Sequence, residues 1–167
     1  MRRLPFVALS SVLAIFVLAG PVAAAEPVVV TADLEGSPIA VAEIPLYLCH
    51  DQDFPQIHCF TTDRELQAAL AARDGGASMA AAAGDYVVVF SLPSYAGSYL
   101  YISQDYDTLA VVGWNDRIRS YRGLNSGLGR FWTDWFHSGA ALDFCCNSNA
   151  PSLSSTFDQQ ITSVYRR

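Results

Sequence analysis

The chain contains 167 residues and has a formal net charge of −6, with 16 Asp and Glu against 10 basic residues, all of which are arginine. An acidic chain without clustered basic residues lacks the charge pattern that binds a phosphate backbone, so nucleic acid is excluded as an expected partner. Hydrophobic residues make up 51% of the chain and charged residues 16%, a composition that supports a folded core and excludes a disordered protein.

Residues 1–25 have the parts of a cleaved signal peptide. A basic start is followed by an apolar stretch over 6–18 and by three alanines at 23–25, which fit a cleavage site. An uncleaved membrane anchor is the alternative, but Gly20 and Pro21 interrupt the apolar stretch, and a membrane span needs about 20 apolar residues. We therefore predict a secreted, extracellular protein that has no membrane attachment after cleavage.

Export bears on the four cysteines, because disulfides form and persist outside the cytosol. Cys49, Cys59, Cys145 and Cys146 allow three connectivities. A Cys49–Cys59 bond would close a short local loop and would leave Cys145 and Cys146 as a bonded neighbouring pair or as free thiols. We favour this local pairing, while pairings that join each N-terminal cysteine to one of the C-terminal pair stay open.

Residues 26–75 are expected to form a small cystine-bearing region that precedes the main domain. The apolar runs 28–32 and 39–41 flank a turn sequence and predict a hairpin. The apolar run 44–49 predicts a further strand.

The same region contains one predicted helix. Thr62 and Glu65 have the spacing of a capping box, in which each side chain accepts a hydrogen bond from a free backbone N–H group. Apolar residues then follow at helical spacing, which predicts a helix over about 63–73. Small residues dominate 76–84, so this segment is expected to be a linker.

Residues 85–167 consist of short runs of β-forming residues separated by Gly, Asn, Asp and Ser, a pattern typical of an antiparallel sandwich. The expected strands lie at 87–90, 98–103, 117–121, 131–136 and 160–165.

This part of the chain also repeats itself, which indicates two similar structural units. An aromatic residue, a second ring five residues later and a glycine two further on occur twice, as Phe90, Tyr95 and Gly97 and as Trp132, His137 and Gly139. A later motif rich in Asn, Asp and Ser occurs at 114–120 and again at 157–163. The early pattern describes a folded hairpin whose glycine adopts a backbone conformation that a Cβ atom would obstruct. We expect each half to be one Greek-key unit that cannot close a core alone.

These motifs resemble the Greek-key pattern of the βγ-crystallin family over about residues 85–167. The resemblance implies a mainly β fold: a two-motif βγ-crystallin-like Greek-key sandwich over 85–167, preceded by a small α+β region with one short helix. Combined with the signal peptide and the cysteines, it points to the secreted bacterial branch of the family. That branch includes a peptidase inhibitor family related to an actinobacterial metalloproteinase inhibitor.

The resemblance implies a non-enzymatic binding or structural protein, and an extracellular protease would be the partner of a peptidase inhibitor. Residues 142–155, which contain Cys145 and Cys146, are the best candidate for an inhibitory loop, because a braced loop loses little entropy on binding. The same segment is equally explained as a connection between strands.

Calcium is the cofactor that the resemblance implies. Carrying over the ligand positions of calcium-binding members gives Asn115, Asp116, Asp158 and Thr162. The chain departs from the pattern at Arg119, which stands where a hydroxyl ligand belongs, and at Gln159, where an acid or Asn is usual. Because Ca²⁺ prefers about 6–8 oxygen ligands, at most one weak site is expected. The alternative is that these loops only stabilise turns.

Six potential metal ligands lie close together in the N-terminal region: Cys49, His50, Asp51, Asp53, His58 and Cys59. If Cys49 faces Cys59 across a hairpin, His50 faces His58 on the opposite face, because side chains alternate along a strand. The cysteines and histidines then cannot share one ion. We expect a disulfide here, with a site formed by the two histidines and an aspartate as the alternative.

The sequence contains none of the common hydrolase or phosphate-binding motifs, so we predict that the protein is not an enzyme. Its large aromatic residues are expected to form the sandwich core, where they bury the most area. Those residues are Trp114, Tyr121, Trp132, Trp135 and Tyr165. The alternative is an exposed aromatic stripe that stacks against sugars, which would make the protein a carbohydrate-binding module with a glycan as its partner.

Overall fold

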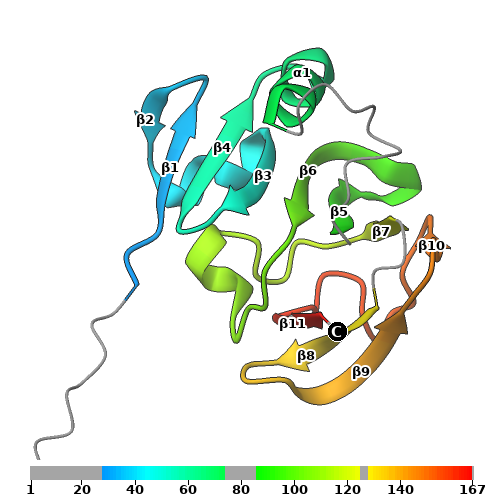
Figure 1. The fold of residues 1–167 in the computed structure, drawn as a ribbon. Coiled ribbons are helices and arrows are strands. Elements are labelled where there is room, and N and C mark those ends of the chain that lie inside the picture. Colours follow the sequence, from blue (N-terminus) through cyan, green and yellow to red (C-terminus); the bar gives the residue numbers. More distant parts are fainter. Residues whose placement is uncertain (1–27, 74–85, 125–127, 167) are drawn as a thin grey trace, which may run out of the picture.

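The computed structural model describes residues 28–73, 86–124 and 128–166, and it shows a mainly β chain with one short α-helix (Figure 1). The predicted fold class is therefore confirmed. The predicted signal peptide and the predicted linker at 76–84 lie outside the described residues.

The elements follow one another along the chain in two groups. The first group contains β1 (Thr31–Leu34), β2 (Ser37–Ile39), the 3-10 helix η1 (Val41–Leu46), β3 (Leu48–Asp53), β4 (Gln56–Phe60) and α1 (Asp63–Arg73). The second contains β5 (Tyr86–Leu92), η2 (Pro93–Tyr95), β6 (Ala96–Ile102), η3 (Leu109–Val112), β7 (Ser120–Leu124), β8 (Gly129–Asp134), β9 (Ser138–Phe144), β10 (Asn149–Ala150) and β11 (Ser163–Arg166).

Each Greek-key half contributes its third strand to the sheet of the other half: β10 from the second half, and the segment around Tyr106 from the first. β10 belongs to the second half but pairs with β7 of the first, in the sheet that also contains β5 and β6. In return, Tyr106 of the first half forms a bridge with Val164 of β11, beside the sheet of β8 and β9. Neither half therefore completes its sheet without the other, as expected for units that cannot close a core alone.

The N-terminal strands extend the first sheet rather than forming a separate one. β3 pairs in parallel with β6, and the sheet continues through β4, β1 and β2 to give eight strands in the order β10-β7-β5-β6-β3-β4-β1-β2 (Figure 1). One hydrophobic core runs under both parts, because Ile57 of β4 belongs to the same buried cluster as Val87 of β5 and Phe131 of β8.

A buried carboxylate also joins the two parts. Asp51 of β3 accepts hydrogen bonds from the backbone N–H of Ser103 at 2.6 Å and from the hydroxyl of Tyr106 at 2.8 Å. These bonds satisfy both oxygens of a side chain that is fully buried, which would otherwise be costly.

Helix α1 begins where the sequence predicts. The Thr62 hydroxyl accepts a hydrogen bond from the backbone N–H of Glu65 at 3.3 Å, and the Glu65 carboxylate accepts one from the backbone N–H of Thr62 at 3.1 Å. Leu66 and Leu70 of the helix pack on the outer face of the sheet, against Val88 and neighbouring aromatic residues. Val88 therefore faces the helix, while Val87 and Val89 face the sandwich core.

The strand predicted at 44–49 is wrong over most of its length. Residues Val41–Leu46 form η1, which contains Pro45, and the strand begins only at Leu48. An apolar run of this kind does not distinguish a buried strand from a buried turn of helix, and Pro lacks the N–H group that a strand ladder needs.

None of the helices in the described ranges is long and apolar enough to cross a membrane.

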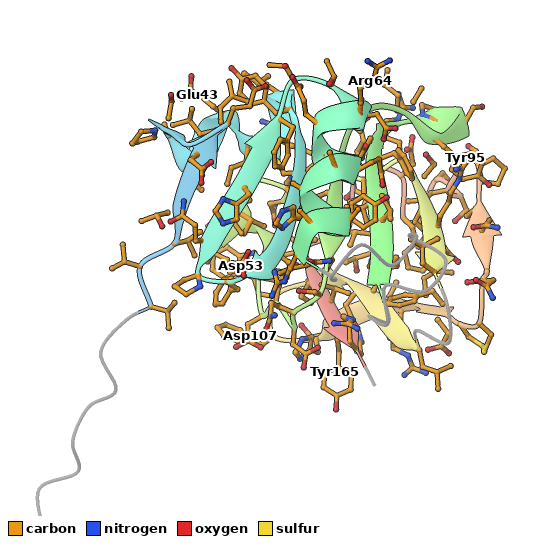
Figure 2. All side chains as sticks on the ribbon, turned by 45° about the horizontal axis from the view of Figure 1, so that its top comes forward. Glu43, Asp53, Arg64, Tyr95, Asp107 and Tyr165 are labelled. Carbon is orange, nitrogen blue, oxygen red and sulfur yellow. A yellow bond between two sulfur atoms is a disulfide. The ribbon has the colours of Figure 1, made fainter. Side chains whose placement is uncertain are left out.

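The predicted aromatic core is correct in part. Trp114 and Tyr121 are buried and Trp132 is half-buried, but Trp135 is 56% exposed and Tyr165 is 39% exposed. Trp135 follows the end of β8 at the tip of a hairpin, and Tyr165 points outward because Val164 beside it points inward. Figure 2 shows Tyr165 projecting away from the sandwich.

Candidate functional site at the junction of the two motifs

The aromatic residues of the repeated early motif pack against each other in equivalent folded hairpins of the two halves. The rings of Phe90 and Tyr95 lie edge to face with centroids 5.7 Å apart, and those of Trp132 and His137 have centroids 4.9 Å apart. Tyr95 and His137 both have left-handed backbone angles, with φ of 61° and 58°. The repeat detected in the sequence is therefore a repeat of backbone geometry.

The motif glycines stand where a side chain cannot fit. Gly97 and Gly139 have φ of +79° and +81°, and a Cβ atom on either would lie within 2.5 Å of another side chain. The contact would be with Ser91 in the first hairpin and with Asp134 in the second. The left-handed backbone favours glycine, and the close approach leaves no room for a Cβ atom unless a neighbouring side chain shifts.

The last serine of each late motif fastens the hairpin of the same half. The Ser120 hydroxyl accepts a hydrogen bond from the backbone N–H of Tyr95 at 3.1 Å and donates one to the carbonyl of Leu92 at 2.7 Å. Ser163 makes the equivalent pair of bonds in the second half, at 3.2 and 2.7 Å. The early and late motifs are therefore two parts of one structural device, although they lie far apart in sequence.

The two late motifs also hold each other. The backbone N–H of Asp116 donates to the carbonyl of Ile161 at 3.1 Å, and the backbone N–H of Gln159 donates to the carbonyl of Ile118 at 3.0 Å. Asp116 and Gln159 have φ of 55° and 56°, so the two loops are related by approximate two-fold symmetry. This symmetry creates two equivalent positions, each formed by the polar residues near the start of one late motif and the sixth residue of the other, Thr162 or Arg119.

The first position collects oxygen atoms. The hydroxyl of Thr162 lies 3.3 Å from one carboxylate oxygen of Asp116, and the side-chain amide of Asn115 donates to the other at 2.6 Å. The Oδ1 atom of Asn115 is buried and has no hydrogen-bond partner within the described residues. An orphaned buried acceptor beside a carboxylate and a hydroxyl fits a hard cation that takes oxygen ligands.

The second position contains a cation of its own. The Arg119 guanidinium donates from Nε and Nη2 to the two oxygens of Asp158, at 3.0 and 2.9 Å. These hydrogen bonds raise the pKa of Arg119 above its usual value. A bound Ca²⁺ does not fit here, because the positive charge of the guanidinium lies against both carboxylate oxygens and would repel a second cation. The structure therefore brings Asn115, Asp116 and Thr162 together but places Asp158 in an ion pair.

The segment predicted as an inhibitory loop is fastened to the sandwich at several points. A disulfide joins Cys145 to Cys146 at the exposed turn after β9. The Ser148 carbonyl accepts from the backbone N–H of Gly123 at 2.7 Å, and β10 pairs with β7. The inhibitory role of this segment stays a prediction.

The N-terminal cysteines pair locally, with a disulfide between Cys49 of β3 and Cys59 of β4. His50 lies opposite His58 in the same register, on the other face of the sheet, as side-chain alternation requires. Within the described ranges, no three or more His, Cys, Asp or Glu side chains are arranged to hold a metal ion.

The sequence singles out His50, Asp53 and His58, but it does not reveal the two charged residues that complete their polar cluster, Asp33 and Arg73. His58 lies between two carboxylates, with Nδ1 2.7 Å from Asp33 and Nε2 3.5 Å from Asp53. Arg73, at the end of α1, lies 2.8 Å from Asp53. Burial, followed by the nearby His58, lowers the pKa of His50 to about 4. Asp33 comes from β1 and Arg73 from α1, so no local pattern could reveal that they lie beside the histidines of β3 and β4.

No protein-family model matches the sequence, and no curated protein is significantly similar to it. Solved βγ-crystallin domains are similar to about half of the chain. One, from work on the evolution of the eye-lens βγ-crystallin domain fold, has 16% identity and a TM-score of 0.48, covering 51% of this chain and 87% of that one. A βγ-crystallin domain from Flavobacterium johnsoniae has 24% identity and a TM-score of 0.44, covering 50% and 94%. A βγ-crystallin from Ciona intestinalis has 21% identity and a TM-score of 0.44, covering 49% and 99%. The similarity concerns the fold alone, and the fold class follows from this chain's own strand pairing.

Proposed function

We propose that this protein is an exported, non-enzymatic binding and structural module that is stabilised by one calcium ion at the first position of the motif junction. The observation that supports this most directly is the buried and unpartnered Oδ1 of Asn115, beside the Asp116 carboxylate that contacts Thr162. Buried polar atoms are almost always hydrogen-bonded, so this one needs a partner, and a cation supplies it.

The donor set explains which ion would bind and how tightly. Asn115, Asp116 and Thr162 offer oxygen ligands from an amide, a carboxylate and a hydroxyl, which suit Ca²⁺ better than softer metals. Only one of the three carries a charge, and ligand charge sets the affinity for Ca²⁺. We expect a dissociation constant of about 10⁻⁴–10⁻³ M, the range of extracellular calcium modules.

The second position supports a stoichiometry of one. Arg119 supplies a positive charge to Asp158 at the place that the pseudo-symmetry makes equivalent to the first site. A guanidinium that is part of the chain holds the loops together at any calcium concentration. The junction is therefore asymmetric, with a resident cation on one side and an exchangeable cation on the other.

Scanning calorimetry of the purified protein in EDTA and in millimolar Ca²⁺ tests the proposal. Calcium should raise the melting temperature, because a ligand that binds only the folded state stabilises it. Thr162→Val, which removes the hydroxyl but keeps the shape, should abolish most of this rise. Thr156→Val is the matched control, because Thr156 is an exposed threonine in the preceding loop. An unchanged melting temperature in calcium, or an equal rise in the Thr162 variant, would contradict the site.

A further inference from the structure

A cavity of about 340 Å³ lies on the outer face of the first sheet, beside helix α1. Its apolar wall consists of Val88, Phe90, Tyr95, Tyr99, Tyr101 and Leu124. Its polar lining consists of Asp63 and Gln67 from α1 and Arg122 from β7. In Figure 2, Tyr95 and Asp53 lie on opposite sides of α1, so the cavity is separate from the histidine cluster.

The aromatic rings form one continuous surface. The centroid of Phe90 lies 5.7 Å from that of Tyr95 and 5.5 Å from that of Tyr99, and the centroid of Tyr99 lies 5.8 Å from that of Tyr101. Phe90 and Tyr101 are buried, whereas Tyr95 and Tyr99 are half-buried and face the cavity. The wall is rigid because its rings support one another.

The polar lining has hydrogen-bonding capacity that the described residues leave unused. The Arg122 guanidinium lies 4.0 Å from the centroid of the Tyr95 ring, and it makes no ion pair or hydrogen bond within the described residues. Gln67 donates to Asp63 and to the Tyr101 hydroxyl, both at 3.2 Å, but its Oε1 is buried and unpartnered there. The cavity therefore offers a cationic donor, Arg122, and an acceptor, the Asp63 carboxylate, beside one apolar wall.

A pyranose ring has the chemistry that matches this combination. One face of the ring carries C–H groups that pack on an aromatic wall, while the hydroxyls around its edge both donate and accept hydrogen bonds. A hydroxyl that donates to the Asp63 carboxylate and another that accepts from Arg122 would engage both polar groups of the lining. The volume is at the small end of the range for ligand sites, about 300–1,000 Å³, which suits a single sugar unit.

We propose that this cavity binds a pyranose unit of a glycan, with the ring face against Tyr95 and Tyr99 and the hydroxyl edge on Asp63 and Arg122. The site is independent of the calcium proposal, since none of its residues belongs to the motif junction. Each can therefore fail without the other.

NMR titrations in EDTA test the site with four probes: the methyl pyranosides of glucose, galactose, N-acetylglucosamine and glucuronic acid. At least one should bind with a dissociation constant on the order of 1 mM, as expected for a ligand of this size. If only the glucuronide binds, its carboxylate is the group that contacts Arg122. Sorbitol carries the hydroxyls without a ring, and it should not bind.

Arg122→Gln and Asp63→Ala should each weaken binding by about tenfold, the effect of losing one well-placed hydrogen bond. Arg130→Gln is the matched control, because Arg130 also lies over an aromatic ring, 5.7 Å from Trp132, but in the other sheet. Melting curves of each variant establish that it folds. Absence of binding by all four probes at about 10 mM, equal binding of sorbitol, or unchanged binding in both cavity variants would overturn the proposal.

Discussion

Arg119 donates two hydrogen bonds to the carboxylate of Asp158, from the sixth residue of the first late motif to the second residue of the second. The pseudo-symmetric counterpart of Arg119 is Thr162, whose hydroxyl lies 3.3 Å from Asp116. The second position of the motif junction therefore contains a guanidinium, whereas the first contains oxygen ligands. This difference between two otherwise equivalent positions is the basis for proposing one calcium ion rather than two.

Ser163→Ala tests the role of the serines that fasten the hairpins. Ser163 is fully buried, and its loss removes the hydrogen bonds that it makes with the N–H of His137 and the carbonyl of Asp134. We expect a loss of about 1–3 kcal/mol in the free energy of unfolding, measured by urea denaturation. Ser138→Ala is the control, since the exposed Ser138 hydroxyl makes one hydrogen bond and should cost less than about 0.5 kcal/mol. Equal effects of the two substitutions would argue against the fastening role.

Gly97→Ala and Gly36→Ala separate backbone strain from close contact. Both glycines have left-handed backbones, with φ of +79° and +83°, but only Gly97 has neighbours within reach of a new Cβ atom. Gly36→Ala should cost about 1 kcal/mol from the backbone alone. Gly97→Ala should cost at least about 1 kcal/mol more, because the Cβ atom would lie 2.4 Å from Ser91. Chemical denaturation measures both, and equal costs would show that the contact is unimportant.

His50 should make the protein sensitive to acid. Burial lowers its pKa to about 4 from the ordinary value of 6.5, so the unfolded chain binds a proton more readily than the folded one. This contribution to stability is fully present above pH 6.5 and is lost as the pH falls toward 4, by at most about 3 kcal/mol. His50→Phe, which keeps a ring beside Phe60, should remove this part of the pH dependence. A variant with the wild-type profile of unfolding free energy between pH 4 and 6.5 would contradict the assignment.

Asp51 should act in the opposite direction. Burial raises the pKa of its carboxyl above the unfolded value of 3.8, so the folded chain holds the proton more tightly. Its contribution is fully present below pH 3.8 and is lost as the pH rises through the folded pKa. Asp51→Asn should therefore gain stability relative to the wild type as the pH rises, by at most about 1.4 kcal/mol per pH unit. Urea denaturation of both proteins at increasing pH above 3.8 measures the difference in their free energies of unfolding. A difference that does not change with pH would contradict the raised pKa of Asp51.

The two disulfides should differ in their effect on stability. The Cys49–Cys59 bond has a sequence separation of 10, and removing it by a double alanine substitution should cost about 3 kcal/mol through loop entropy. Cys145 and Cys146 are adjacent and exposed, so their bond encloses no chain segment. Their double alanine variant should change the free energy of unfolding by less than about 1 kcal/mol. Mass spectrometry of unreduced peptides checks the pairing itself, and a crossed pairing would contradict both expectations.

The features that the sequence predicts correctly are local or repeated. The capping box of Thr62 and Glu65 marks the start of α1, and the doubled aromatic and glycine motif indicates two Greek-key halves. Each of these signals lies within one short segment, where the physical cause and the pattern coincide.

The features that the sequence does not reveal depend on distant pairings. β10 has two residues and the bridge of Tyr106 has one, so the exchange of third strands leaves almost no periodic signal. The parallel pairing of β3 with β6 is likewise not encoded by either strand alone. Arg119 is recognisable in the sequence as a departure from a calcium ligand, but its partner Asp158 is identified only by the packing of the two loops.

The number of calcium ions bound per chain tests the asymmetric junction most directly. Isothermal titration calorimetry of the purified protein with CaCl₂ measures it. We predict one weak site per chain, with a dissociation constant of about 10⁻⁴–10⁻³ M, that is lost in Thr162→Val. Two sites per chain would show that Arg119 does not exclude the ion from the second position. No binding would show that Asn115, Asp116 and Thr162 only stabilise their loops.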